Sequence, residues 1–382
     1  MSTLKGAKWV LNDLAKNGYE GFIVGGAVRD YLLKEPLNDI DITTNALPHQ
    51  VSKIFKTKPT GLKYGTVTVF MHEETFEVTT YRIDGEYQDS RHPESVTFSE
   101  TVVEDVNRRD FTINGLLMNA KGEIIDYVNG KEDLQNKIIR TIGNPFDRFN
   151  EDALRILRAF YFQSKLGFQI DKETREAITQ SKHKLKDIAM ERILNELLKI
   201  LKGKYVKRAF QSMITTGVHE LLPGLKEGIE YANNMEDFPF IDAFFTLSFT
   251  LNKFVPQEWP FSNKHRHKYE TASKLALHHE YFDAYTLYTY GLELCILANK
   301  VNYMLGKSKN LKNKIESDFE HLPIQSDLDL KLRASDILRL TDKKAGAWLK
   351  NLQTEMVIEV INRRLENKKE VLEHFVLTKL KG

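Results

Sequence analysis

The chain has 382 residues, of which 41% are hydrophobic and 28% are charged, and its formal net charge is +2. This length exceeds what one compact core usually holds and indicates about two to four domains. No apolar run approaches the roughly 20 residues that span a bilayer. The single cysteine, Cys295, excludes an intramolecular disulfide and a cysteine metal cluster. These features predict a soluble, cytoplasmic protein with no membrane partner, and they imply no protein partner.

Charge is distributed unevenly along the chain. Residues 1–140 contain 17 Lys and Arg against 21 Asp and Glu, whereas the remainder contains 38 against 32. An acidic N-terminal part suits cation binding, and a basic remainder suits a polyanion such as a nucleic acid. Taken alone, the same distribution fits ordinary solvated surfaces equally well.

Up to about residue 140, strand patterns alternate with helical ones. Helices are predicted over Leu4–Lys16, Ala27–Leu33 and Pro48–Phe55. Strands are predicted over Phe22–Gly25, Asp39–Thr43, Thr66–Met71, Thr75–Tyr81, Gly115–Asn119 and Ile124–Tyr127. After Gly143 the pattern is helical, with helices predicted over Arg148–Leu166, Lys172–Ser181 and Met190–Lys202. The sequence therefore predicts an α+β head followed by an all-helical remainder.

The segment FIVGGAVRD predicts a strand that ends in Gly25 and Gly26 and a helix that starts at once. Two glycines let backbone N–H groups approach an anion closely, and a helix N-terminus adds partial positive charge. Arg29, one turn into the helix, can bind phosphate oxygens through two N–H groups. Read alone, the segment is equally compatible with a plain strand–helix turn.

The next strand carries Asp39-Ile40-Asp41. Residues two apart on a strand point to the same face, so Asp39 and Asp41 can share a pair of divalent ions while Ile40 points into the core. Such oxygen ligands suit Mg²⁺ and the two-metal displacement of phosphoryl groups. An isolated DxD is common in surface loops, but one on the strand after a GGxxR turn is a stronger signal. The same face argument makes Glu77 a candidate third carboxylate, although a solvated glutamate is the simpler interpretation.

The segment NRRDFTIN covers Asn107–Asn114. Its adjacent arginines, of which Arg109 is the second, can serve a triphosphate, and Asp110 can serve a ribose hydroxyl. Read without context, RRD fits the start of a helix with a surface ion pair.

A strong helical pattern follows in RFNEDALRILRA, where Asp152, Arg155 and Arg158 are spaced by three and are predicted to share one helix face. Cytosine and adenine both offer an amino donor beside a ring-nitrogen acceptor, whereas uracil and guanine offer the reverse order. A carboxylate next to a guanidinium therefore matches the hydrogen-bonding edge of cytosine and adenine and does not match that of uracil and guanine. A protein built this way selects C and A without a nucleic-acid template. The simpler interpretation is an intrahelical salt bridge.

Together these segments resemble five motifs of the class II tRNA nucleotidyltransferases, the bacterial CCA-adding enzymes of the polymerase-β superfamily. GGAVRD with DID resembles motif A, NRRDFTIN motif B, DYVNGKEDL motif C, EDALRILRA motif D and ERILNELLKIL motif E. The resemblance is nearly continuous over residues 22–205. It implies a catalytic nucleotidyltransferase head with a small mixed or antiparallel sheet. The implied division is head 1–142, helical neck 143–205 for nucleotide selection, helical body 206–275 and helical tail 276–382 for tRNA binding.

The resemblance also implies roles for the head residues. Asp39 and Asp41 would bind Mg²⁺ and activate the tRNA 3′-hydroxyl. Gly26, Arg29 and Arg109 would hold the incoming triphosphate.

Further roles are implied for the sugar and the base. Asp110 would sense the ribose 2′-hydroxyl, and Asp152 and Arg155 would pair with the base edge with support from Arg158. One departure concerns motif C, where Asn129-Gly130 stands in place of a common Gly-Gly pair and is expected to stiffen the link between head and neck.

The same motifs occur in CC-adding enzymes, A-adding enzymes and bacterial poly(A) polymerases. The segment DGEYQDSRHP resembles the flexible loop with which CCA-adding members switch from C to A, and its residues include Asp84, Arg91, His92 and Pro93. Read alone, it is a polar loop between strands. The resemblance therefore implies addition of C, C and A to the 3′ end of tRNA from CTP and ATP, with release of pyrophosphate. The alternatives are a poly(A) polymerase, a CC- or A-adding enzyme, and a non-catalytic RNA-binding protein with a degenerate head.

Overall fold

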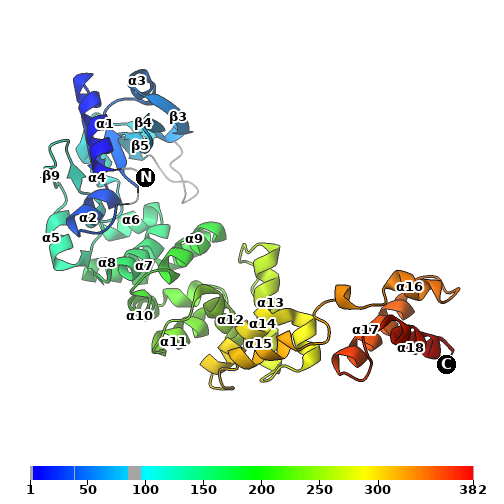
Figure 1. Ribbon diagram of the computed structural model, residues 1–382. Helices are drawn as coiled ribbons and strands as arrows, with labels where there is room; N and C mark the ends of the chain where they lie inside the picture. The colour runs from blue at the N-terminus through cyan, green and yellow to red at the C-terminus, as the bar shows by residue number, and fades with distance from the viewer. Residues whose placement is uncertain (1–2, 38, 85–95, 382) are drawn as a thin grey trace. The chain divides into compact units, whose positions relative to one another are not determined.

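The computed structural model describes residues 3–37, 39–84 and 96–381. The chain divides into two compact units, Met1–Leu222 with Glu258–Pro260 and Pro223–Gln257 with Phe261–Gly382. The first unit contains a β-sheet with helices, and the second is built of helices (Figure 1). The predicted fold class, an α+β head followed by helices, is confirmed. The finer division at residues 142, 205 and 275 remains a prediction.

The head is built on a seven-stranded sheet in the order β3-β4-β5-β2-β1-β8-β9. Its strands are β1 (Gly21–Val24), β2 (Asp41–Thr44), β3 (Lys56–Gly61), β4 (Thr66–Met71), β5 (Glu74–Thr80), β8 (Leu117–Met118) and β9 (Ile124–Ile125). Neighbouring strands are antiparallel except β2 and β5, which are parallel. Two further pairs are β6 (Arg82–Asp84) with β7 (Val96–Phe98), antiparallel, and β10 (Ile138–Ile139) with β11 (Gln169–Ile170), parallel. The sheet is therefore mixed. Its parallel pair consists of β5 and β2, and β2, which begins at Asp41, is called the acidic strand from here on.

Strand β3 was not predicted from the sequence. Its residues KTKPTG are polar, and none of their side chains is buried. It lies at the edge of the sheet and pairs only with β4. An edge strand without a buried face has no alternation of apolar residues, which is the signal that sequence patterns supply.

The head helices are α1 (Leu4–Lys16), α2 (Gly26–Leu32), α3 (Pro48–Ile54), α4 (Val102–Asn107) and α5 (Gly130–Asn136). Helix α1 has the predicted bounds, because Val10, Leu11 and Leu14 recur at helical spacing and are buried. The Thr3 hydroxyl accepts a hydrogen bond from Gly6 N and caps the helix. Segment RRD does not begin a helix, since α4 ends at Asn107 just before it.

The helices that follow are α6 (Pro145–Glu151), α7 (Leu154–Leu166), α8 (Lys172–Ser181), α9 (Met190–Leu201) and α10 (Val206–Thr216). The prediction of one continuous helix over Arg148–Leu166 is wrong. Asp152 has φ −145° and ψ 103°, which is extended, and it separates α6 from α7. Its carboxylate accepts a hydrogen bond from Leu154 N, and this local bond competes with the continuous helix. The predicted common helix face of Asp152, Arg155 and Arg158 is therefore wrong for Asp152.

Short 3₁₀ helices occur in both units. Those of the first unit are η1 (Leu62–Tyr64), η2 (Thr112–Asn114), η3 (Lys182–Asp187) and η4 (Val218–Leu221), and η5 (Asp327–Asp329) lies in the second.

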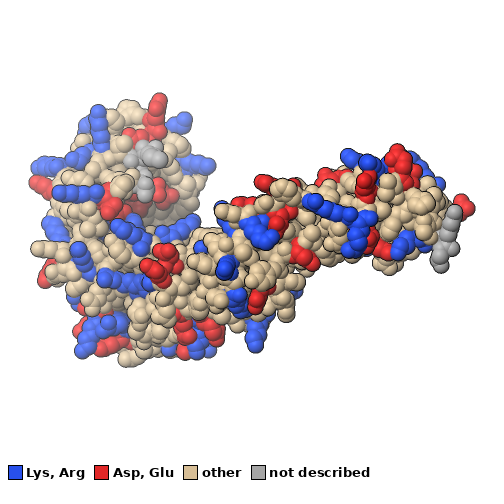
Figure 2. Space-filling view, turned by 60° about the horizontal axis from the view of Figure 1, so that its bottom comes forward, with Lys and Arg blue, Asp and Glu red and all other residues tan. Residues whose placement is uncertain are grey.

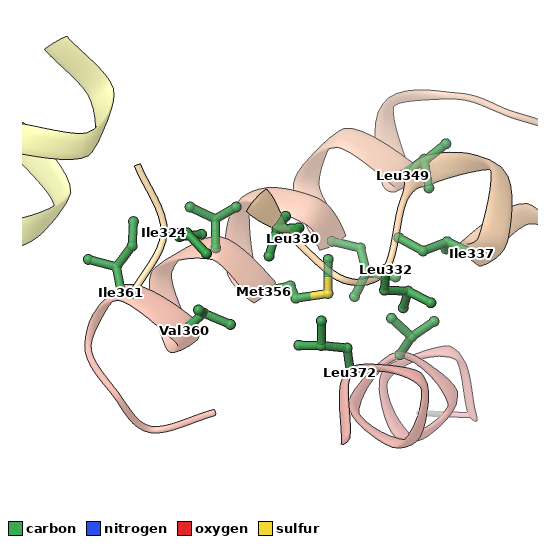
Figure 3. Close-up of a cluster of buried hydrophobic side chains, with 12 residues drawn as sticks. Ile324, Leu330, Leu332, Ile337, Leu349, Met356, Val360, Ile361 and Leu372 are labelled. Carbon is green, nitrogen blue, oxygen red and sulfur yellow. The ribbon is translucent and has the colours of Figure 1, made fainter. Parts of the chain in front are cut away.

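The second unit contains α11 (Lys226–Asn234), α12 (Ile241–Asn252), α13 (Asn263–His278), α14 (Ala284–Met304), α15 (Lys312–Glu320), α16 (Ala334–Arg339), α17 (Ala347–Ile361) and α18 (Lys369–Lys381). The last helices share a buried apolar cluster, in which Met356 lies among Leu330, Leu332 and Leu372 (Figure 3). No helix of the described part of the chain is long and apolar enough to cross a membrane.

Surface charge is mixed on the face drawn in Figure 2. Lysine and arginine side chains lie among aspartates and glutamates over each of the two units. The unequal charge of the two parts of the sequence therefore does not gather into a patch of one sign on this face.

Candidate active site

Two carboxylates lie at the start of strand β2, and a third lies opposite them on β5. Asp41 is its first residue and Asp39 precedes it, and both side chains are exposed. Parallel pairing with β5 sets Glu77 opposite Asp41, and paired residues of neighbouring strands project to the same face of a sheet. Glu77 is exposed as well, whereas Ile40 is buried at 2% exposure, as expected for a residue on the opposite face. Asp41 and Glu77 are therefore neighbours on adjacent strands.

The pKa of Asp41 is raised above its ordinary value. Although the residue as a whole is exposed, neighbouring protein atoms limit the water around its carboxylate, and the negative charges of Glu77 and Asp39 add to the rise, while Arg109 opposes it. A bound cation would offset this concentration of negative charge. Among the residues that the structure describes, no group of three or more His, Cys, Asp or Glu is placed to hold a metal ion by itself. Exposed carboxylates that leave ligand positions for phosphate oxygens fit a hard divalent cation bound together with its substrate.

The turn between β1 and α2 lies against an arginine of the NRRDFTIN segment. Gly25 has φ 73° and ψ −132°, a conformation that favours glycine. A Cβ built at Gly25 would lie 3.5 Å from a guanidinium nitrogen of Arg109. A Cβ at Gly26 would lie 3.5 Å from a guanidinium nitrogen of Arg29. An anion bound at this turn would therefore meet open glycine backbone and a cationic side chain together.

Arg109 is held by Asp105, a residue that the sequence patterns did not single out. Asp105 is fully buried in α4, and one of its oxygens accepts hydrogen bonds from Arg109 at 3.0 Å and from the Thr43 hydroxyl at 3.1 Å. Its other oxygen accepts from Arg108 at 2.8 Å. Burial alone would raise the pKa of Asp105, but the charges of Arg109 and Arg108 hold it below its ordinary value. Because Thr43 follows Asp41 by two residues on β2, Asp105 connects Arg109 to the acidic strand.

A buried chain of hydrogen bonds joins α2 to α7. Arg29 is 3% exposed and donates to Asp30 at 2.8 Å and to the Asn114 side chain at 2.6 Å. The Asn114 amide donates to Asp110 Oδ1 at 3.0 Å. Arg158 donates to Asp110 Oδ2, with its Nε at 2.7 Å. The structure thus brings three predicted site residues, Arg29, Asp110 and Arg158, into one network.

Asp152 and Arg155 lie close in the chain, but each is held by another partner. Asp152 Oδ1 accepts from Leu154 N at 3.0 Å, and Oδ2 accepts from Arg192 of α9 at 2.9 Å. Arg155 is 7% exposed and donates to Glu151 at 2.6 Å. Within the described part of the chain the two side chains do not bond to each other, although Arg155 N donates to the Asp152 carbonyl oxygen at 3.1 Å. The two groups are therefore positioned separately.

Arg155 also connects α7 to the NRRDFTIN segment. Its guanidinium donates to the backbone carbonyls of Arg148 at 3.0 Å and Arg108 at 3.1 Å. Arg148 in turn donates to the carbonyls of Asn107 and Arg109. These bonds connect α6 and α7 to the segment that carries Arg109. The candidate residues for base selection and for phosphate binding are therefore linked by one set of hydrogen bonds.

Two of the supporting residues had weak sequence signals. Asp105 precedes Arg109 by four residues, the spacing of a helical ion pair, and this was the available indication. Arg192 lies in the segment that resembles motif E, 40 positions from Asp152. A contact over that distance along the chain leaves no periodic pattern.

Of the predicted switching-loop residues Asp84, Arg91, His92 and Pro93, the structure describes only Asp84. Asp84 is the last residue of β6, whereas Arg91, His92 and Pro93 lie outside the described residues. Strands β6 and β7 on either side of the loop pair with each other.

Three family models match the chain in order. They are described as Poly A polymerase head domain over residues 21–140, Probable RNA and SrmB-binding site of polymerase A over 167–229, and tRNA nucleotidyltransferase domain 2 over 243–376. The CCA-adding enzyme of Bacillus cytotoxicus is 36% identical, with 98% of each chain covered. That of Bacillus subtilis is also 36% identical, with 97% of this chain and 96% of the relative covered.

Solved structures agree with these relatives. The Bacillus stearothermophilus CCA-adding enzyme in complex with CTP matches with a TM-score of 0.85 at 32% identity, covering 100% of this chain and 98% of that one. The Thermotoga maritima CCA-adding enzyme complexed with tRNA shares the fold, with a TM-score of 0.64 at 19% identity over 98% of this chain and 94% of that one. Since relatives above 30% identity match over nearly their whole length, the chain belongs to the bacterial CCA-adding enzymes, the tRNA nucleotidyltransferases of the polymerase-β superfamily.

Proposed function

We propose that this chain adds C, C and A in turn to the 3′ end of tRNA, from CTP and ATP and without a template, and releases pyrophosphate. One observation carries the proposal: Arg109 lies both against the Gly25 turn and within electrostatic reach of Asp41. A triphosphate bound at the turn would therefore have its phosphates next to the carboxylates of β2. The full-length likeness to curated CCA-adding enzymes supports the same activity.

In this proposal Asp39 and Asp41 hold Mg²⁺, in keeping with the divalent metal use of the nucleotidyltransferase family. The raised pKa of Asp41 supports a cation site, because a cation would offset the charges of Glu77 and Asp39. When bound, the metal supplies charge stabilisation for in-line displacement at the α-phosphate. Glu77 adds negative charge beside Asp41 and strengthens cation binding.

The triphosphate is bound by the turn and by Arg109. Gly26 contributes open backbone, and Arg109 contributes a guanidinium that Asp105 holds toward the turn. Arg29 is almost fully buried and already paired with Asp30 and Asn114, so its part is to support the turn from within the protein.

The neck residues select the nucleotide. Asp152 accepts the amino group of C or A, and Arg155 donates to the adjacent ring nitrogen. Their separate anchoring by Arg192 and Glu151 supports this role, because each group keeps one orientation without a bound base. Asp110 binds the ribose hydroxyl, and Arg158 supports Asp110.

The remaining parts of the chain follow from the same proposal. The predicted neck, body and tail at residues 143–205, 206–275 and 276–382 would grip tRNA by shape and phosphate. Because tRNA, CTP and ATP are its substrates, the protein would act in the cytoplasm. Full CCA addition, as opposed to CC or A addition alone, is favoured by the curated relatives and by the resemblance of the segment from Asp84 to Pro93.

The experiment supplies tRNA that lacks its 3′ CCA, Mg²⁺, and CTP and ATP singly and together. Two C followed by one A, with no further addition, supports the proposal, whereas a long A tail would assign the chain to the poly(A) polymerases. Asp39→Ala with Asp41→Ala should abolish incorporation. Asp13→Ala, which removes an exposed carboxylate of α1, is the matched control and should retain it. Incorporation that survives the double substitution would refute the metal assignment.

A further inference from the structure

Glu196 of α9 is a buried carboxylate to which the proposed function gives no role. Its side chain is 5% exposed, and Oε1 accepts a hydrogen bond from Lys199 at 2.7 Å. Oε2 is buried and has no hydrogen-bond partner among the described residues. A buried carboxylate oxygen without a donor is costly, and a donor that reaches it in another state of the protein would offset this cost.

Arg158 is the nearby cation that can supply this donor. Helices α7 and α9 pack against each other. The negative charge of Asp110, and to a smaller extent that of Glu196, raises the pKa of Arg158. The Arg158 side chain is 32% exposed and lies over the ring of Phe162 at 5.4 Å. Arg158 therefore has two acidic neighbours, one that it binds and one whose Oε2 lacks a donor.

The bond between Arg158 and Asp110 occupies the carboxylate oxygen that a substrate would need. Asp110 Oδ1 accepts from Phe111 N at 2.8 Å and from Asn114 at 3.0 Å. Asp110 Oδ2 accepts from Arg158 Nε at 2.7 Å and from a second guanidinium nitrogen at 2.6 Å. A carboxylate has about four lone-pair sites on its two oxygens, and all are then used. A ribose hydroxyl can bind Oδ2 only when Arg158 gives up at least one of its bonds.

We propose that Glu196 is the second acceptor of Arg158: when a ribose hydroxyl binds Asp110, the Arg158 guanidinium turns toward Glu196 Oε2. This inference rests on the ribose-binding role proposed for Asp110. The exchange keeps the charge of Arg158 paired before and after nucleotide binding. Asp110 takes the ribose hydroxyl in place of a guanidinium N–H and keeps its bonds from Phe111 N and Asn114. Arg158 lies on α7 and Glu196 on α9, and because these helices pack against each other the Arg158 side chain would turn across their interface. Glu196 is then a positioning residue that makes Asp110 available to ribonucleotides.

The test uses Glu196→Gln in the full-length protein, because glutamine keeps the shape of the side chain and removes its charge. Arg158 should then stay on Asp110. Binding of ATP and CTP should weaken by about tenfold, the loss of one charge-assisted hydrogen bond, while binding of dATP and dCTP changes little. The matched control is Glu176→Gln, the same change at a carboxylate of α8 that is 55% exposed, and it should leave all four affinities as in the wild type. Equilibrium binding and the melting temperature are measured for each variant.

A second measurement avoids any effect of substitution on folding. In wild-type protein labelled with ¹⁵N-arginine, the Arg158 Nε–H signal should shift on addition of ATP and shift much less with dATP. An unchanged preference for ATP over dATP in Glu196→Gln would overturn the inference. So would equal weakening of ATP and dATP binding, or Arg158 signals that respond alike to both nucleotides. If Asp110→Asn also keeps the wild-type preference, the ribose role of Asp110 fails as well; if only Glu196→Gln does, the exchange alone fails.

Discussion

Replacement of Asp105 by asparagine tests the framework that holds Arg109 next to the acidic strand. The Asp105 carboxylate is fully buried and binds Arg108, Arg109 and the Thr43 hydroxyl. Asparagine keeps the size of the side chain but removes its charge. Its amide also turns two N–H groups toward partners that are themselves donors. Both arginines then lose their buried counter-ion.

The expected loss of stability follows from the burial of the three groups. Removal of one partner of a buried ion pair costs about 3–5 kcal/mol. The side chains of Arg108 and Arg109 are 17% and 19% exposed and can regain some water, so we expect about 3 kcal/mol for Asp105→Asn. For a domain of about 150–250 residues, each kcal/mol lowers the melting temperature by about 2–4 °C. The transition of the first unit should therefore fall by about 6–12 °C.

The assay combines thermal unfolding with steady-state kinetics of CTP incorporation into tRNA that lacks CCA. Because Arg109 loses its anchor, the KM for CTP should rise more than kcat falls. Glu100→Gln, a change at an exposed carboxylate just before α4, is the control and should alter neither quantity. A melting temperature within about 2 °C of the wild type, together with an unchanged KM, would show that Asp105 does not hold Arg109 in place.

The same substitution has a defined pH dependence. The pKa of Asp105 lies below its ordinary value in the folded protein. Its stabilising contribution is therefore present above the unfolded pKa of about 3.9 and is lost as the pH falls through the folded value. The difference in unfolding free energy between wild type and Asp105→Asn should be constant near neutral pH and shrink below about pH 4. A difference that grows as the pH falls would contradict this sign.

Three further predictions concern other parts of the first unit. Asp152→Ala should reduce the preference for CTP and ATP over UTP and GTP by about tenfold, because it removes one of the two groups proposed to bind the base edge. The preference is measured as incorporation with each nucleotide supplied singly, and equal slowing with all four would exclude a role of Asp152 in base selection. Glu77→Gln should lower the pKa of Asp41 by removing a negative neighbour, so the pH midpoint of Mn²⁺ binding, which needs the ionised carboxylate, should move to lower pH even though the lost charge weakens binding near neutral pH; an unchanged or higher midpoint would contradict this. Gly130→Ala should cost about 1–3 kcal/mol in denaturant unfolding, because its Cβ would lie 2.2 Å from the Thr112 carbonyl oxygen; a variant as stable as the wild type would contradict this close approach.

Much of the head could be predicted because its signals are local. The apolar spacing of α1, the alternation in β4 and β5, and the Gly25-Gly26 turn each depend on residues that are neighbours in the chain. The break at Asp152 was missed because the apolar pattern continues across it. The hydrogen bond from Leu154 N to the Asp152 side chain, which ends the helix there, leaves no trace in that pattern. Strand β3 was missed because it has no buried face.

Residue identity and short spacings are enough to identify the kinds of chemical group in the candidate site: paired carboxylates, a glycine turn, arginines and a carboxylate that can read a base. The same features support the resemblance to the family. Which of these groups bind one another is visible only in the folded chain. Asp152 binds Arg192, Arg109 binds Asp105, and Asp110 binds Arg158. Apart from the helical ion pair of Asp105, these contacts join separate elements, and no periodicity along the chain encodes them.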